Sequence, residues 1–199
     1  DIHQYAATKV YKKPREEVTK EQRKRAKSIG FGILYGARPK RISITMSEKG
    51  LPTTPMEATV LFNEYHRSFP SIQTTTRAFE TQLSRYGYCE NPFGRRYYVS
   101  KRESYIMLNY MCQGTSADIM KRAMVRVWRW LKSNVPSANI ILTVHDEIVI
   151  ECRIGDLKVI AEAIKPIMED LTSFFVPVTV SGELVRTNWG EKIDLEKII

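Results

Sequence analysis

The sequence has 199 residues, of which 43% are hydrophobic and 27% charged, a composition typical of a globular chain with a sizeable core. Lysine and arginine total 31 against 22 aspartate and glutamate residues, and the resulting net charge of +9 favours a polyanionic partner. The three cysteines have no paired spacing, so we expect a reducing compartment and neither a disulfide framework nor a zinc site. No apolar run is long enough for a membrane span, and the first residues do not form a signal peptide.

The first elements are two predicted helices. Residues 1–13 carry apolar side chains at helical spacing, and His3 lies in their first turn, where a lone histidine is typical of a surface or capping position. A second helix is predicted over residues 19–36, because Thr19 followed by Gln22 forms a capping-box pattern. This second helix carries the strongest functional signal in the chain.

One side of the helix over 19–36 carries Arg23, Lys27, Phe31 and Tyr35, each four residues after the previous one, with Gly36 next. Cations near a helix N-terminus suit a polyphosphate, and the aromatic rings suit a sugar or base. The alternative is an amphipathic helix with a solvated basic face. The two large rings on the same side favour the binding interpretation.

Three more helices are predicted over 40–49, 55–68 and 71–86, the last ending at Gly87. The segment YCENPFGRRYYVSK then predicts a β-hairpin, since a turn sequence lies between strand-forming aromatic residues. Arg95 and Arg96 in this hairpin form either a solvated turn or a grip on a backbone phosphate.

A long helix is predicted over about 103–133, with an irregularity at Gly114. Asn109 and Gln113 are four residues apart and therefore share a face. Their amides suit the hydrogen-bond acceptors of a minor groove, although polar residues on a half-exposed helix have the same pattern.

Residues 139–151, NIILTVHDEIVIE, predict a tight buried hairpin with His145, Asp146 and Glu147 at its tip. Neighbouring carboxylates suit half of a Mg²⁺ site, although an acidic turn is also a common surface feature. A helix over 156–174 and a strand over 176–185 complete an α/β piece with an antiparallel sheet.

Taken together, RKRAKSIGFGILYG, NYMCQGTSAD and VHDEIVIE, with FGRR and TNW, resemble motifs of the family A DNA polymerases in order and spacing. The resemblance implies a right-hand polymerase fold of the α/β (α+β) type, with mainly fingers at 1–86 and palm at 87–199. It also implies transfer of a nucleotide from a dNTP to a primer 3′ end, with primer–template DNA as partner and two Mg²⁺ ions as cofactors.

The same resemblance assigns roles residue by residue. The nucleotide site that it implies consists of His3, Arg23, Lys27, Phe31 and Tyr35. Lys27 would also supply a proton to the leaving pyrophosphate, Phe31 would stack near the sugar and base, and Tyr35 would stand at the templating position, with Gly36 allowing the helix to bend.

The implied DNA and metal contacts are Tyr35, Gly36, Arg95, Arg96, Asn109, Gln113, His145, Asp146 and Glu147. Asp146 would ligate the catalytic metals, Glu147 would assist catalysis, and His145 would lie near the primer terminus. Asn109 and Gln113 would sense a correctly paired primer end.

The sequence departs from the family pattern in two ways. Tyr105 occupies a position, four residues before Asn109, where the family usually has an arginine, so an aromatic contact would replace a charged one. The family's first palm aspartate, in a DYSQIE-like motif, has no match in this chain, and neither has the thumb. The second metal-binding carboxylate would therefore come from an N-terminal portion outside this chain.

We therefore expect the C-terminal part of a split, cleaved or truncated DNA polymerase, active only with that N-terminal portion and located in the cytoplasm of a bacterial or phage-infected cell, or in an organelle. Two alternatives are a fragment of a single-subunit RNA polymerase and a non-catalytic DNA-binding subunit. Comparing dNTP with rNTP incorporation distinguishes the first, and salt-dependent DNA binding without turnover distinguishes the second.

Overall fold

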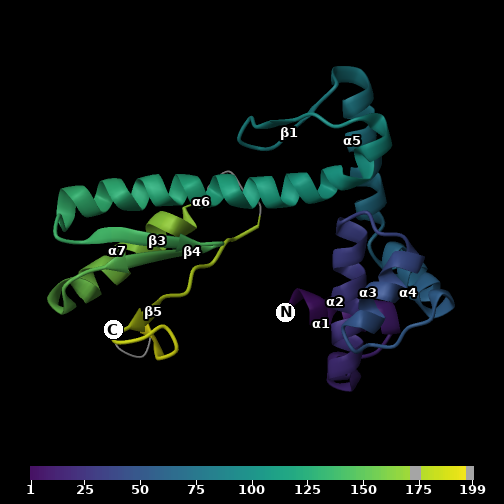
Figure 1. The fold of residues 1–199 in the computed structure, drawn as a ribbon, viewed down its shortest axis with the longest axis horizontal. Coiled ribbons are helices and arrows are strands. Elements are labelled where there is room, and N and C mark those ends of the chain that lie inside the picture. The colour runs from purple at the N-terminus through teal and green to yellow at the C-terminus, as the bar shows by residue number, and fades with distance from the viewer. Residues whose placement is uncertain (171–175, 196–199) are drawn as a thin grey trace. The chain divides into compact units, whose positions relative to one another are not determined.

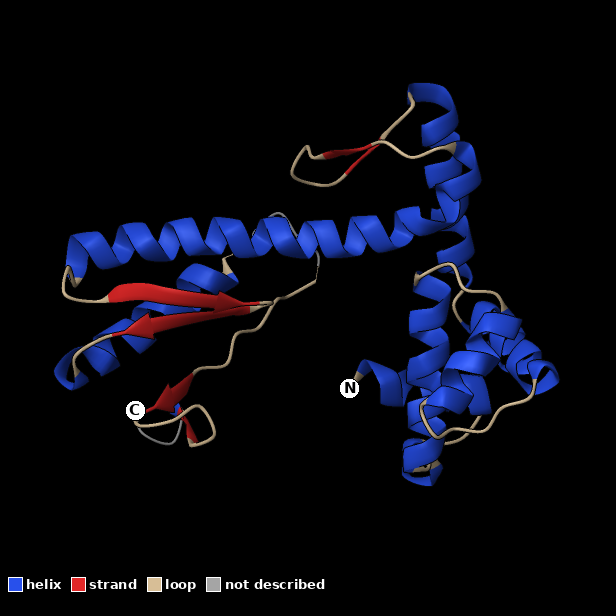
Figure 2. Cartoon of the chain, viewed as in Figure 1, coloured by secondary structure: helices blue, strands red, loops and turns tan. Residues whose placement is uncertain are grey.

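The computed structural model describes residues 1–170 and 176–195. The chain forms two compact units, Asp1–Thr115 and Ser116–Ile199 (Figure 1). Most of the described secondary structure is helical, and the strands form small antiparallel sheets (Figure 2). This architecture confirms the predicted α+β class.

The first unit begins with five helices: α1 (Ile2–Tyr11), α2 (Lys20–Leu34), α3 (Pro39–Glu48), α4 (Pro55–Ser68) and α5 (Pro70–Tyr86). The predicted capping box is present, since Thr19 Oγ1 accepts from the Gln22 N–H and Gln22 Oε1 accepts from the Thr19 N–H, both at 3.1 Å. Gly87 adopts a φ of 76° after α5, a left-handed conformation that ends a helix readily at glycine. All five predicted helices are confirmed.

The inner face of α2 builds the core of this unit. Ile29 and Ile33 pack with Ile42 and Met46 of α3 and with Ala58 of α4. Each large apolar side chain buried in this way contributes about 1.5–3 kcal/mol. Because this face is fixed inward, the Arg23–Tyr35 side of α2 is fixed outward.

The predicted hairpin is also present, with β1 (Cys89–Glu90) antiparallel to β2 (Arg96–Tyr97). Cys89 lies opposite Tyr97 and both face a core that includes Leu83 and Met107. Since neighbouring residues of a strand point to opposite faces, Glu90 and Arg96 face away from that core.

After the hairpin, a 3₁₀ segment, η2 (Lys101–Ile106), leads into α6 (Met107–Asn134). The predicted irregularity at Gly114 is wrong, because α6 continues through it without a break. The glycine is instead a site of close packing: a Cβ there would overlap the Tyr97 hydroxyl and lie 2.6 Å from its Cζ.

The second unit contains β3 (Asn139–Val144) and β4 (Glu147–Glu151), an antiparallel pair with a bulge between Ile140 and Leu142. Helix α7 (Leu157–Glu169) follows η3 (Ile154–Asp156), and its buried face packs with Val127 and Leu131 of α6. The predicted helix over 156–174 is confirmed through Glu169, whereas 171–174 lie outside the described residues.

Two further strands, β5 (Glu183–Val185) and β6 (Lys192–Asp194), pair with one another. The predicted strand over 176–185 is therefore confirmed only at its end. Within the described part of the chain, residues 183–185 have a partner strand and 176–182 have none, so the β-prone sequence alone does not make a strand there.

The β3–β4 hairpin itself is confirmed, but the prediction that it is buried is wrong, because β3 is mostly exposed and the three central residues of β4 are only half-buried. Ile140 and Ile150 pack against the core of the second unit. Ile141 and Leu142 remain 58% and 48% exposed, because only one side of the hairpin is covered by α6 and α7.

Among the described helices, none combines the length and apolar character of a membrane span.

Candidate nucleotide and DNA site

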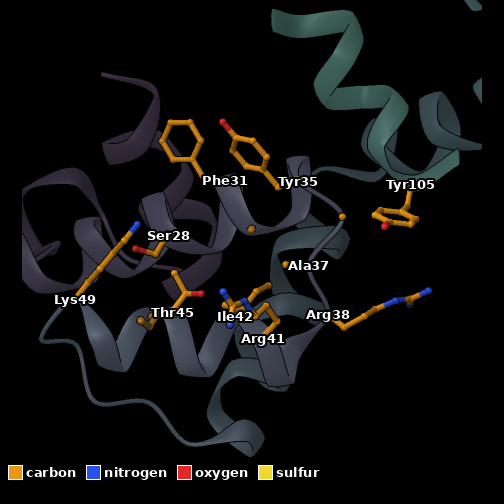
Figure 3. Close-up of a pocket in the computed structure, with 13 residues that line it drawn as sticks. Ser28, Phe31, Tyr35, Ala37, Arg38, Arg41, Ile42, Thr45, Lys49 and Tyr105 are labelled. Carbon is orange, nitrogen blue, oxygen red and sulfur yellow. The ribbon is translucent and has the colours of Figure 1, made fainter. Parts of the chain in front are cut away.

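The outward side of α2 carries the predicted row of functional side chains. Phe31 and Tyr35 are 43% and 51% exposed, and Figure 3 shows both rings rising from the same side of the helix. The Lys27 Nζ lies 5.8 Å from the centre of the Phe31 ring, close enough for a cation–π contact. We call Arg23, Lys27, Phe31 and Tyr35 the α2 row.

Helix α1 brings His3 to this row. Small residues at the contact, Ala6 and Ala7 of α1 and Ala26 of α2, let the two helices approach closely. The His3 ring consequently lies 5.6 Å from the Phe31 ring. Its pKa is lowered by burial first and then by the positive charges of Lys27 and Arg23.

Asp1 is a member of this site that the sequence analysis missed. One carboxylate oxygen, Oδ1, caps α1 by accepting from the N–H groups of His3 and Gln4. The other, Oδ2, accepts from Arg23 Nε at 2.8 Å and Nη2 at 2.6 Å. No local sequence signal connects the two residues, which are 22 positions apart.

A groove of about 980 Å³ lies beside the second half of the row. Phe31, Tyr35 and Tyr105 provide aromatic lining, and Arg38 and Arg41 provide positive charge (Figure 3). Aromatic and cationic side chains around one groove suit a ligand with a flat ring and a phosphate.

Gly36 connects the row to Tyr105. Its φ is 70°, and a Cβ at this position would lie 3.1 Å from both Tyr105 Cγ and the Tyr105 carbonyl oxygen. The substituted aromatic residue therefore packs directly on the glycine that ends α2, and a side chain at Gly36 would displace it.

The predicted DNA-sensing amides lie next to the same end of α2. Gln113 is exposed, and its Nε2 donates a hydrogen bond of 2.8 Å to the Tyr35 hydroxyl. Asn109 lies one turn earlier on α6 and is only 9% exposed. The structure thus joins two predicted DNA contacts, Tyr35 and Gln113, directly to one another.

The twin arginines lie in the β1–β2 hairpin. Arg95 is exposed, and its backbone N–H donates to Asn91 Oδ1 at 3.0 Å. Arg96 forms an ion pair with Glu90, with 3.0 Å between Nε and Oε2, and its guanidinium lies 4.5 Å from the centre of the Tyr88 ring.

The acidic turn belongs to the second unit. His145 and Asp146 make a two-residue connection between β3 and β4, and His145 has a φ of 52°. Glu147 lies 3.7 Å from Lys192 Nζ, whereas Asp146 forms no ion pair with any residue that the structure describes.

This turn fits part of a magnesium site. Carboxylate oxygens are the ligands that Mg²⁺ prefers, and an exposed carboxylate can take up an ion without losing an existing ion pair. The described residues contain no group of three or more histidine, cysteine, aspartate or glutamate side chains that could hold a metal on their own. Further ligands would have to join Asp146.

Comparison with known proteins identifies the family. A family model for DNA polymerase family A matches residues 1–191. The chain belongs to DNA polymerase family A. The predicted resemblance is thereby confirmed.

Among family A relatives, the chain is 34% identical to DNA polymerase I of Pseudomonas aeruginosa over 201 aligned residues, which cover 96% of the chain and 21% of the relative. It is also 34% identical to the thermostable DNA polymerase I of Thermus aquaticus, covering 90% of the chain and 22% of the relative. The chain therefore spans about a fifth of the length of these curated relatives.

A solved structure supports the same fold. The POL domain of Pol1 from M. smegmatis, in complex with DNA primer-template and dNTP, matches with a TM-score of 0.79 and 27% sequence identity. The match covers 89% of this chain and 32% of that chain. The predicted polymerase fold, incomplete in this chain, is confirmed.

Proposed function

We propose that this chain is the C-terminal portion of a template-directed DNA polymerase, with mainly fingers at residues 1–86 and palm at 87–199. The reaction is attack of a primer 3′-oxygen on the α-phosphate of a dNTP, with pyrophosphate as the leaving group. The observation that carries the proposal is the convergence of His3, Arg23, Lys27 and Phe31 on one exposed side of α2.

The α2 row would bind and orient the nucleotide. Arg23 and Lys27 offer charged donors to the phosphates, and Phe31 offers a ring face to the sugar and base. Lys27 would give a proton to the leaving pyrophosphate. Burial and then the two cations lower the pKa of His3, so His3 would bind a phosphate more readily once that anion offsets the charge of the cations.

The palm hairpin would supply one carboxylate centre. Asp146 would hold Mg²⁺, with Glu147 assisting and His145 near the primer terminus. Bound Mg²⁺ would stabilise charge on the attacking and leaving oxygens. Tyr35, Asn109 and Gln113 would read the templating position and the paired primer end, and Arg95 and Arg96 would hold backbone phosphates.

We propose further that an N-terminal portion outside this chain completes the enzyme, either as a separate chain or as a joined segment. Two observations support this. A two-stranded hairpin is marginally stable alone, and among the described residues β3 and β4 pair only with one another, so their outer edges are open to a further strand. The lone carboxylate centre at Asp146 also needs ligands from elsewhere to hold two metals.

The first test is the intact mass of every polypeptide in the purified protein, with primer extension on the same material. The expected result is Mg²⁺-dependent dNTP incorporation with the DYSQIE-like motif present, either on a second polypeptide or on one longer polypeptide. A chain of 23.0 kDa without extension, even after the N-terminal portion is added, contradicts the polymerase proposal and favours a DNA-binding subunit.

The second test places the chemistry in the palm hairpin. In the reconstituted enzyme, Asp146→Asn should reduce extension to background and leave primer–template binding largely unchanged. Glu151→Gln, at the opposite end of the same hairpin, is the matched control and should keep parental activity. Extension by Asp146→Asn at near the parental rate rules out this assignment.

A further inference from the structure

The β1–β2 hairpin and the end of α5 carry a group of aromatic and cationic side chains, of which only Arg96 has a role in the function proposed above. Ring centres of Tyr86 and Tyr88 are 6.3 Å apart, and those of Tyr88 and Tyr98 are 5.6 Å apart. Arg85 lies 5.2 Å from the Tyr86 ring and Arg96 lies 4.5 Å from the Tyr88 ring. We call these five residues the tyrosine–arginine cluster.

The cluster lies on the face of the hairpin that points away from the core. Cys89 and Tyr97, which are paired across the two strands, face the buried residues of the first unit. Strand alternation places their neighbours Tyr88 and Tyr98 on the opposite face. Tyr98 is 69% exposed and Tyr86, at the end of α5, is 53% exposed.

Packing inside the protein does not account for this arrangement. A cross-strand pair of rings can stabilise a hairpin, which would explain Tyr88 and Tyr98 alone. Tyr86 lies outside the hairpin, and both arginines hold their guanidinium groups beside rings rather than in the core, Arg96 while also paired with Glu90. Exposed rings with cations beside them are a combination that binds single-stranded nucleic acid.

We propose that the tyrosine–arginine cluster is a binding platform for single-stranded DNA. Unpaired bases would stack on the exposed rings, and Arg85 and Arg96 would contact the phosphates between them. A duplex cannot bind in this way, since its bases are already stacked and paired. The proposal rests on the polymerase function in one respect: it identifies the bound single strand as the unpaired part of the template.

The test uses the 199-residue chain and a short fluorescein-labelled oligothymidylate, with binding followed by fluorescence anisotropy. Tyr98→Leu and Tyr86→Leu retain apolar bulk but remove the ring faces. Each should weaken binding about fivefold or more, the lower end of what one base–ring stack contributes. Binding of a blunt duplex should stay at the parental level.

Tyr5 provides the matched control. It is 54% exposed, and Lys9 Nζ lies 5.4 Å from its ring centre, so it resembles the cluster tyrosines in exposure and in its cation contact. Tyr5→Leu should leave oligothymidylate binding unchanged. An equal loss in Tyr5→Leu, or an equal loss of duplex binding in the cluster variants, overturns the proposal.

Salt dependence separates stacking from charge. Arg96→Gln should reduce the slope of log K against log salt concentration by about 0.7, the value for one phosphate contact on a single strand. Tyr98→Leu should weaken binding without changing that slope. A Tyr98→Leu variant with a lowered melting temperature but parental oligothymidylate affinity shows a hairpin-stabilising role only and refutes the platform.

The same experiment keeps this proposal distinct from the polymerase function. Oligothymidylate binding needs neither dNTP nor Asp146, so it can be measured whether or not the reconstituted protein extends primers. Tyrosine-dependent binding in a protein that never extends a primer supports the platform and contradicts the polymerase function. Primer extension together with tyrosine-independent binding supports the polymerase function and contradicts the platform.

Discussion

Replacing Gly36 with alanine tests how tightly the end of α2 is fixed against Tyr105. Two separate effects should destabilise the variant. The φ of 70° is a left-handed conformation that costs an alanine about 1 kcal/mol. The new Cβ would also overlap the Tyr105 ring and lie 3.1 Å from the Tyr105 carbonyl oxygen, and such overpacking typically costs about 1–3 kcal/mol.

The expected loss of unfolding free energy for Gly36→Ala is therefore about 2–4 kcal/mol. Gly50 is a matched control in the same unit, because its φ is 73° and a Cβ there would meet nothing within 4 Å. Gly50→Ala should cost only the conformational part, about 1 kcal/mol. The difference between the two variants measures the contact with Tyr105.

Urea unfolding followed by far-UV circular dichroism provides the measurement, since the first unit is mainly helical. Tyr105 is 51% exposed, so the substitution Tyr105→Ala alone should lower the unfolding free energy only slightly. In the double variant most of the steric cost should disappear, leaving the conformational cost and the contact with the backbone carbonyl. The reasoning is refuted if Gly36→Ala costs no more than Gly50→Ala, or if truncating Tyr105 relieves none of the loss.

Three further predictions concern the α2 row and its neighbours. Tyr35→Phe removes the hydrogen bond from Gln113 and should lower the unfolding free energy in urea by no more than about 1 kcal/mol, since the bond is exposed; a loss well above this contradicts the geometry. Arg23→Ala should weaken binding of inorganic tripolyphosphate about tenfold in calorimetry, as expected for loss of a charge-assisted hydrogen bond, whereas the exposed neighbour Lys24→Ala should bind like the parent. The pKa of His3 is lowered in the folded chain, so the unfolded chain binds a proton more readily at pH values near and below 6.5, the usual pKa of histidine. The unfolding free energy should therefore fall as the pH drops through that range. His3→Gln should reduce this pH dependence in urea titrations, and an unchanged dependence argues against the placement of His3 beside Lys27 and Arg23.

The features that could be predicted from sequence depend on short-range signals. The start of α2 follows from Thr19 and Gln22, whose side chains and N–H groups satisfy one another within a single turn. The end of α5 follows from Gly87, and the hairpin tip from the polar residues between two β-rich runs. Each signal depends on interactions within a few residues, so it does not require a particular tertiary packing.

The features that sequence analysis missed depend on residues far apart in the chain. The Asp1–Arg23 pair and the Gln113–Tyr35 bond join positions 22 and 78 residues apart. Gly114 carries the pattern of a helix break, yet its lack of a side chain serves to admit the Tyr97 ring. In each case the packing of whole helices and strands determines which residues meet. Composition and periodicity contain no information about that packing.

The β3–β4 hairpin shows how a long-range contact changes the meaning of a local motif. Without the family resemblance, the sequence presents Asp146 and Glu147 as two equivalent carboxylates beside a turn. In the structure Lys192 lies 3.7 Å from Glu147 and 2.8 Å from Glu183, and hydrogen bonds and the nearby carboxylates raise the pKa of its ammonium group. A metal would have to compete with this cation for Glu147 but not for Asp146, for which the described residues offer no ion pair. In the metal site proposed above, we therefore expect Asp146 to be the better ligand of the two and Glu147 to have the assisting role.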